Sequence, residues 1–194
     1  MMTTKKYKTG LACMRGQPFH LGHKLILDEM CNSCARVYLA LGSAQEEGTS
    51  SNPIPYLFRK YLVENNYPFE VFTKKLIIFP AEDIHDLPNW SKYLLDKIDE
   101  QVDVYFAGDN YDAVPFTEYP ATDYPKVEVK VLDRKDNHFL SGSEIRKMFK
   151  EGDPTWKDYV PKDNIEATSA ALEGKHPFPA MLELEIFKED MGIL

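Results

Sequence analysis

The sequence of 194 residues lacks several features that mark whole classes of protein. No apolar run approaches the ~18 residues that a membrane-spanning helix needs, and the start, Met-Met-Thr-Thr-Lys-Lys, does not resemble a signal sequence. Three cysteines, an odd number, do not suggest a disulfide framework. The formal net charge is −8, without the excess of Lys and Arg that nucleic-acid binding favours. We therefore expect a cytoplasmic protein without a membrane or nucleic-acid partner.

What remains is the composition of a globular protein, with 43% hydrophobic and 28% charged residues. Cys31 and Cys34 form a Cys-x-x-Cys pair inside a predicted helix, and no second pair completes a metal site. A metal site needs about four ligands, so we interpret the pair as two thiols on one face of a buried helix.

Apolar runs alternate with segments of helical period along the chain. The predicted strands are Lys8 to Met14, Arg36 to Leu41, Leu76 to Phe79, Asp103 to Ala107 and Val127 to Leu132. The predicted helices are Leu21 to Ser33, Tyr56 to Asn65, Asn89 to Glu100, Ser143 to Lys150 and Asn164 to Leu172. This alternation predicts an α/β fold with a doubly wound parallel sheet, whose ligands bind at the carboxyl ends of the strands.

The chain is predicted to form one domain over residues 1–165, with a small helical C-terminal extension over residues 166–194 packed on it. Residues 46–55 and the proline- and aromatic-rich residues 115–125 are predicted loops.

The stretch from Arg15 to His23, Arg-Gly-Gln-Pro-Phe-His-Leu-Gly-His, follows the first predicted strand and precedes a helix. A strand–loop–helix turn points helix-start amides at its ligand and favours a phosphate. Gly22 permits close approach, and the imidazoles of His20 and His23 can donate hydrogen bonds to phosphate oxygens. The two histidines could instead be a turn residue and a helix cap, so the pattern needs support.

A second loop, Ser141-Gly142-Ser143-Glu144-Ile145-Arg146, supplies that support. Ser141 with Glu144 fits a capping box, and Ser143 could equally be the cap. Arg146 falls in the first helical turn, where a cation is unfavourable unless an anion offsets it. The loop predicts a second anion site, although a plain helix cap with a surface arginine would also fit.

Together these motifs resemble those of the HxGH nucleotidyltransferase superfamily, and most closely the archaeal-type nicotinamide-mononucleotide adenylyltransferases. In their opening motif, Gly-Arg-Phe-Gln-Pro-Phe-His-x-Gly-His, only two positions differ here, where Met14 and Gly16 replace glycine and phenylalanine. The family's Gly-Ser-Ala-Gln-Glu, Asn-Pro and following arginine match residues 42–46, 52–53 and Arg59, although Phe58 replaces a glutamate. Its segment with Asp-Ile, then Asn and Trp, resembles residues 83–84 and 89–90.

The resemblance implies a Rossmann-like nucleotidyltransferase fold and assigns roles to residues of this sequence. The implied catalytic residues are His20, His23 and Arg146. The implied ATP-binding residues are Arg15, Gln17, Phe19, Gly22, Gly108, Asp109, Ser141, Gly142 and Ser143. The implied acceptor-binding residues are Ser43, Gln45, Arg59, Asp83, Asn89 and Trp90. Trp90 would stack on the cationic nicotinamide ring, although it could equally be a core tryptophan.

The resemblance predicts an enzyme that joins ATP and nicotinamide mononucleotide to give NAD and pyrophosphate. We expect Mg²⁺, bound mainly through the ATP phosphates because no carboxylate cluster has metal-ligand spacing, and a homo-oligomer. Two alternatives stay open. One is the same fold with another acceptor, such as phosphopantetheine, riboflavin phosphate or a phospho-alcohol, and the other is a non-catalytic nucleotide-binding regulator.

Overall fold

The structure, a computed structural model, describes residues 5–132 and 139–175. Five strands form one sheet in the order β3-β2-β1-β4-β5, and every neighbouring pair is parallel. They are β1 (Tyr7–Met14), β2 (Cys34–Leu41), β3 (Leu76–Pro80), β4 (Val104–Ala107) and β5 (Glu128–Val131). In the centre, Ala12 of β1 lies opposite Leu39 of β2 and Phe106 of β4. The predicted parallel α/β sheet is thereby confirmed.

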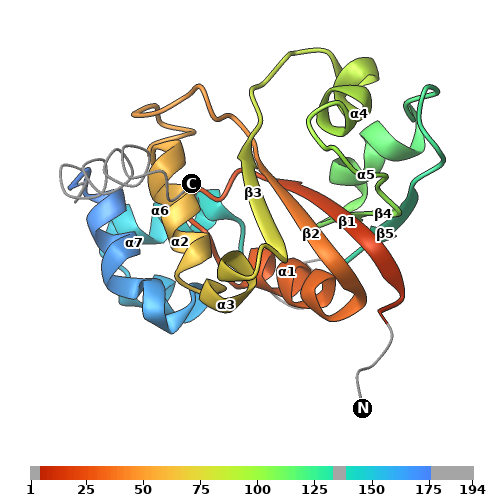
Figure 1. Cartoon of the computed structure of the whole chain (residues 1–194). Helices are drawn as coiled ribbons and strands as arrows, with labels where there is room; N and C mark the ends of the chain where they lie inside the picture. The colour runs from red at the N-terminus through yellow and green to blue at the C-terminus, as the bar shows by residue number, and fades with distance from the viewer. Residues whose placement is uncertain (1–4, 133–138, 176–194) are drawn as a thin grey trace, which may run out of the picture.

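Helices cover both faces of this sheet, as Figure 1 shows for α4 and α5 on one side and α1 and α2 on the other. They are α1 (Leu21–Ser33), α2 (Tyr56–Glu64), α3 (Pro68–Phe72), α4 (Leu87–Leu95), α5 (Asn110–Thr117), α6 (Gly142–Glu151) and α7 (Ile165–Leu172), with short 3-10 helices η1 (Pro154–Tyr159) and η2 (Lys162–Asn164). Among the described residues, no helix combines the length and the apolar character needed to cross a membrane.

The two faces of the sheet bury separate apolar clusters. Leu11 of β1 packs with Leu94 of α4 and Phe116 of α5, whereas its neighbour Ala12 packs with the cluster that contains Leu27 of α1. Successive side chains of a strand point to opposite faces, so a strand covered on both faces must be apolar throughout. This explains why the carboxyl-terminal halves of β1 and β2, residues 10–14 and 37–41, appear in the sequence as apolar runs.

The structure corrects several predicted boundaries. The loop predicted over residues 115–125 begins too early, because residues 110–117 form helix α5 and Pro115 lies inside it. Phe116 stacks on Tyr105 of β4 with ring centroids 4.0 Å apart, and such packing offsets the hydrogen bond that a proline removes. Helix α4 ends at Leu95, five residues earlier than predicted.

The two nearby cysteines do not share a helix face as predicted. Helix α1 ends at Ser33, so Cys34 is the first residue of β2 while Cys31 stays on the helix. Both thiols are free and buried, and burial raises the pKa of Cys31 to about 11.

A third apolar cluster joins α6 to the segment that follows it, where Trp156 packs beside Ile145 of α6. The side-chain amide of Asn164 ties this segment to α2 by donating a hydrogen bond of 2.8 Å to the carbonyl of Leu62. Within the described part of the predicted extension, up to residue 175, Ala171 of α7 is buried in the cluster that contains Leu62 of α2, so this part lies against the domain. Residues 176–194 lie outside the described residues, so the extension over 166–194 stays a prediction.

Candidate active site

A cleft of about 760 Å³ opens at the carboxyl ends of the central strands. From β1 the chain builds the sheet in one direction through β2 and β3, and it then returns to add β4 and β5 on the other side of β1. Ligands of doubly wound folds bind at such a switch point. Predicted site residues that line the cleft are Arg15, Gln17, His20, His23, Ser43, Asp83, Trp90, Ser141, Gly142, Ser143 and Arg146. The two widely separated motifs therefore share one cavity.

Three side-chain rings in the turn after β1 stack on one another. His20 and His23 lie with ring centroids 3.7 Å apart, and the other neighbour of His23 is Phe19 at 5.9 Å. Phe19 is fully buried, and each histidine is less than a tenth exposed. Phe19 thus supports the histidines from the core and does not line the cleft.

His20 caps the first turn of α1. Its Nδ1 accepts a hydrogen bond of 3.1 Å from the amide of Gly22, so Nδ1 carries no proton in that contact. In a neutral imidazole the proton must then sit on Nε2, which makes Nε2 a donor. The backbone amide of Gly22 therefore selects the tautomer of His20 that carries its proton on Nε2.

The start of α6 packs directly on the turn after β1. A Cβ atom at Gly142 would lie 2.5 Å from the carbonyl oxygen of Gln17, so only glycine fits. Nη1 of Arg146 donates to the same carbonyl oxygen at 2.6 Å. The backbone of Gln17 is therefore the point where two motifs 129 residues apart in sequence join.

The capping box predicted at α6 is present. Ser141 is the cap, and its amide donates to Oε2 of Glu144 at 2.8 Å while its hydroxyl accepts from the amide of Glu144 at 3.3 Å. The hydroxyls of Ser141 and Ser143 lie 2.9 Å apart beside the cleft. Arg146 has a lowered pKa, first because it is partly buried and then because Arg15 is near. Two neighbouring guanidinium groups repel each other, and a bound polyanion would relieve that repulsion.

Arg59 is not at the surface of the cleft, which contradicts its predicted contact with the acceptor. Its guanidinium is fully buried and donates to the carbonyls of Arg15 at 2.6 Å, Gly42 at 2.7 Å and Ser43 at 3.1 Å. Burial lowers its pKa to about 10. Arg59 therefore holds the loops after β1 and β2 together from beneath the cleft.

Two glutamines of the motifs also hold loops in place. The side-chain amide of Gln17 donates to the carbonyl of Ile54 and accepts from its amide, both at 2.9 Å. Oε1 of Gln45 accepts from the amide of Asp83 at 3.1 Å, which joins the loop after β2 to the loop after β3. Gln45 is not among the described residues that line the cleft.

The far end of the cleft is aromatic and acidic. Trp90 stacks on Tyr93 at 5.2 Å, and Tyr93 is fixed by a hydrogen bond of 2.9 Å from the amide of Glu82. Asp83 and Asp112 line this region. Burial first, and then the negative charges of Asp112 and Asp83, raise the pKa of Cys13 at the cleft floor to about 12. Asn89, in contrast, is exposed, and its amide donates to Oδ2 of Asp86 at 2.8 Å.

The residues after β4 that line the cleft lie a few positions later in the sequence than predicted. Asp109 caps α5 by accepting from the amide of Asp112 at 2.8 Å, and the described cleft wall includes neither Gly108 nor Asp109. Instead Tyr111, Asp112 and Pro115 from the helix itself line the cleft, and Tyr111 is 81% exposed. The signal that could have found them is their position in the helix that follows a predicted buried strand.

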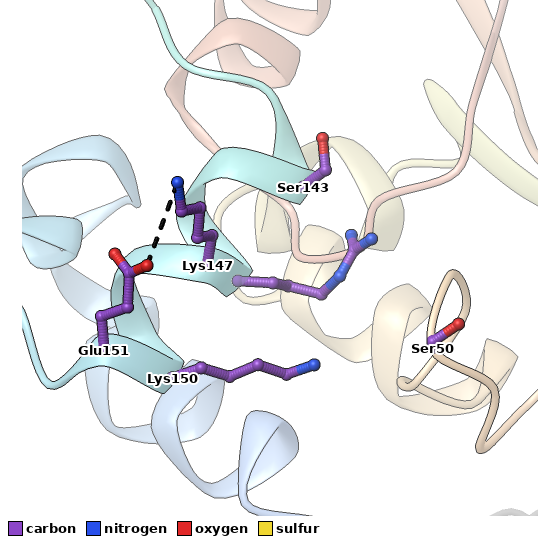
Figure 2. Close-up of a pocket in the computed structure, with 6 residues that line it drawn as sticks. Ser50, Ser143, Lys147, Lys150 and Glu151 are labelled. Atoms are coloured by element: carbon purple, nitrogen blue, oxygen red, sulfur yellow. Dashed lines mark ion pairs between the residues drawn. The ribbon is translucent and has the colours of Figure 1, made fainter.

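A smaller pocket of about 330 Å³, here named the α6 pocket, adjoins the cleft. It is lined by Ser50, Ser143, Arg146, Lys147, Lys150 and Glu151. Ser143 and Arg146 line both cavities. Figure 2 shows Lys147 paired with Glu151, with Nζ and Oε1 3.9 Å apart, and Lys150 extended across the pocket.

The residues alone offer no complete metal site. Within the described residues, no group of three or more His, Cys, Asp or Glu side chains could hold an ion. A divalent ion at this site would need most of its ligands from a bound polyphosphate and water, as Mg²⁺ commonly does.

Comparison with known proteins shows what the chain resembles. It is 26% identical over 156 residues to the nicotinamide-nucleotide adenylyltransferase of Archaeoglobus fulgidus, which covers 78% of this chain and 85% of that one. It is 24% identical over 184 residues to the enzyme of that name from Halobacterium salinarum, which covers 92% and 95%. No protein-family model matches the chain.

Solved structures share the fold. A bifunctional NMN adenylyltransferase/ADP ribose pyrophosphatase from Francisella tularensis has a TM-score of 0.65 at 19% identity, over 79% of this chain and 45% of that one. The chain therefore spans about half the length of that bifunctional protein. The nicotinic acid mononucleotide adenylyltransferase of Plasmodium falciparum has a TM-score of 0.54 at 14% identity, over 87% and 95%. These findings confirm the predicted resemblance: the chain is similar over most of its length to archaeal nicotinamide-nucleotide adenylyltransferases and has the nucleotidyltransferase fold.

Proposed function

We propose that this protein transfers the adenylyl group of ATP to nicotinamide mononucleotide and produces NAD and pyrophosphate. One observation carries the proposal. The carbonyl of Gln17 joins the histidine turn to the start of α6, and this junction forms one end of a cleft whose other end carries Trp90. The cleft volume of about 760 Å³ is within the usual range for a small-molecule site. The names of the sequence relatives support the same reaction.

The cationic end of the cleft suits the triphosphate of ATP. Burial first, and then the nearby charge of Arg15, lower the pKa of Arg146, and the amides at the start of α6 add partial positive charge. The guanidinium of Arg146, the fifth residue of α6, reaches back to the helix start beside Gly142, where a cation opposes the helix dipole and a bound phosphate would offset that cost. We therefore assign Arg15, Arg146, Ser141 and Ser143 to the phosphates.

The reaction is an in-line displacement at the α-phosphorus. An oxygen of the mononucleotide's 5′-phosphate forms a bond to this phosphorus, while the bond to the bridging oxygen breaks and pyrophosphate leaves with the electron pair. The attacking phosphate is already ionised at neutral pH, so no general base is required. Catalysis then depends on position and on neutralising charge at the bridging and leaving oxygens.

His20 is well placed to donate a hydrogen bond to those oxygens. The amide of Gly22 fixes its tautomer with the proton on Nε2, and the stacked rings of His23 and Phe19 fix its plane. A donor held in advance by the fold costs no reorganisation in the transition state. We assign His20 and His23 to stabilising the pentacoordinate phosphorus and the departing pyrophosphate.

A divalent metal ion is part of the proposal. One solved structure of the Francisella tularensis protein, with a TM-score of 0.63 and 18% identity over 96% of this chain and 56% of that one, is complexed with AMP and a Mn ion. We propose Mg²⁺, which would neutralise the phosphate oxygens when bound and would be held through the triphosphate that Arg146 and Arg15 position.

The other end of the cleft suits the acceptor's ring. Trp90 presents an aromatic side chain to the cleft, and Asp83 and Asp112 add negative charge. A pyridinium ring is flat and cationic, so it gains from stacking, from cation–π attraction and from nearby carboxylates. Ser43, whose backbone is in the left-handed region with φ of 51°, lines the cleft between the two ends.

The test is to incubate the protein with ATP and Mg²⁺ plus one candidate acceptor at a time, and to identify products by mass. We expect NAD and pyrophosphate only when ATP and a pyridine mononucleotide are both present. Turnover with phosphopantetheine or CTP, and none with the mononucleotide, would show that the proposed acceptor is wrong. Nucleotide binding without any turnover would favour a regulator. The predicted homo-oligomer stays a prediction, which light scattering would check.

A further inference from the structure

The α6 pocket holds more positive charge than its own carboxylate can balance. Arg146, Lys147 and Lys150 line it with a single acidic residue, Glu151. The pair of Lys147 and Glu151 is long, at 3.9 Å, and both side chains are more than half exposed. The second carboxylate of α6, Glu144, is engaged in the capping box and does not line the pocket, so the pocket itself is cationic in a chain whose formal net charge is −8 and favours an anionic ligand.

Lys150 is the exposed lysine of the pocket whose charge is available to a ligand. Within residues 5–132 and 139–175 it makes no hydrogen bond or ion pair. Figure 2 shows its side chain extended from α6 toward the side of the pocket where Ser50 lies. Ser50 belongs to the segment 46–55 that Gln17 anchors through Ile54, so this wall is tied to the histidine turn. The pocket is thus built between two elements that are both fixed to the catalytic turn.

The position of the pocket follows the direction of the reaction. In an in-line displacement the leaving group departs from the face of phosphorus opposite the attacking oxygen. The acceptor end of the cleft lies at α4, and Figure 1 shows α4 and α6 on opposite sides of the central strands. Ser143 and Arg146 line both the cleft and the α6 pocket, so a phosphate moving away from the acceptor passes them into that pocket.

We propose that the α6 pocket is a product-release subsite, in which Lys147 and Lys150 receive the pyrophosphate that leaves ATP. This inference rests on the proposed function, because it takes its ligand from that reaction. Pyrophosphate carries several negative charges, and two lysines beside Arg146 match it without any further chemistry. The lysines hold the product after the bond to the α-phosphorus is broken, so they set pyrophosphate affinity and not acceptor affinity.

The experiment measures pyrophosphate in two ways. Titration calorimetry gives its Kd without any turnover, and the reverse reaction of NAD with pyrophosphate gives its KM. Lys150→Gln should raise both about threefold to fivefold, the scale of one exposed ion pair, and Lys147→Gln combined with Lys150→Gln should raise them further. Added salt should shrink the difference between the variants and the wild type. The KM for the mononucleotide should stay within about twofold.

Two variants make the result specific. Lys157→Gln removes an equal charge from an exposed lysine of η1 outside the pocket, and it should leave pyrophosphate binding unchanged. Lys150→Arg keeps the charge and should retain binding. A double variant that binds pyrophosphate like the wild type, or an equal loss in Lys157→Gln, would overturn this inference alone if the wild type makes NAD. A wild type that makes no NAD would overturn the proposed function and the inference with it.

Discussion

The two ends of the cleft are built in different ways. At the phosphate end, Gly142 lies against the backbone of Gln17, and Arg146 donates to the same carbonyl at 2.6 Å. The rings of His20 and His23 are almost fully buried. At the acceptor end, side chains from α4 and α5 face the cleft, and Tyr111 is 81% exposed.

This difference separates catalysis from specificity. Charge that must meet a transition state gains most when the fold fixes it in advance. A ring that only has to be recognised can be held by aromatic side chains on helix starts and loops. We therefore expect substitutions at the phosphate end to lower kcat, and substitutions at the acceptor end to raise the KM of the mononucleotide.

The largest expected effect is that of Arg146→Ala. An arginine that neutralises a transferring phosphoryl group is commonly worth ~10³-fold or more in kcat. Arg146→Lys should recover little, because a lysine cannot reach the carbonyl of Gln17 and the phosphates with one planar group. Steady-state kinetics on both variants would check this.

The melting temperature supplies the control for Arg146. Because the guanidinium of Arg146 lies beside Gly142 at the start of α6, where a cation opposes the helix dipole, removing it should lower stability little. A large fall in melting temperature with a normal kcat per folded molecule would mean that Arg146 only joins the two motifs. The phosphate end would then be no different in kind from the acceptor end.

Arg59→Met tests the foundation shared by both ends. Three backbone carbonyls accept hydrogen bonds from this buried guanidinium, and each would lose its partner. We expect a loss of about 2–4 kcal/mol in the free energy of unfolding, measured by urea denaturation. If Arg59 instead contacted the phosphate of the mononucleotide directly, Arg59→Met would keep normal stability and raise the KM of the mononucleotide.

Trp90→Ala should have a smaller effect, confined to one substrate. Stacking of a heterocycle on an aromatic side chain is worth ~1–3 kcal/mol, so the KM of the mononucleotide should rise roughly five- to a hundredfold while ATP affinity holds. Asn89→Ala is the matched control from the same helix, because Asn89 contacts Asp86 and lies outside the described cleft wall. It should change the KM less than about twofold. Weakened ATP binding in Trp90→Ala would mean that the nicotinamide ring binds in another part of the cleft.

The sheet and the phosphate end could be predicted because their signals are local. Apolar runs mark the carboxyl-terminal halves of β1 and β2, and the motifs follow the strand ends directly, which in a parallel sheet brings them to one edge. The capping box at Ser141 needs only the spacing to Glu144.

What sequence reasoning missed depends on packing between distant residues. Nothing near Arg59 in the sequence shows that three carbonyls from the loops after β1 and β2 surround it. Pro115 suggests a loop by its own chemistry, yet Phe116 packs on Tyr105 and the helix continues. Tyr111 and Asp112 reach the cleft only because this helix forms.

The most direct test of this account is His20→Ala, with kcat, ATP Kd and melting temperature measured on one preparation. Removing a preorganised donor to a developing charge typically costs ~10²–10³-fold in kcat, or ~2.7–4 kcal/mol. We predict a fall of that size with ATP Kd changed only a few fold, because Arg146 and the helix-start amides remain, and with a melting temperature close to that of the wild type. A variant that keeps its kcat, or one that loses activity only by unfolding, would contradict the claim that this end of the cleft carries the chemistry.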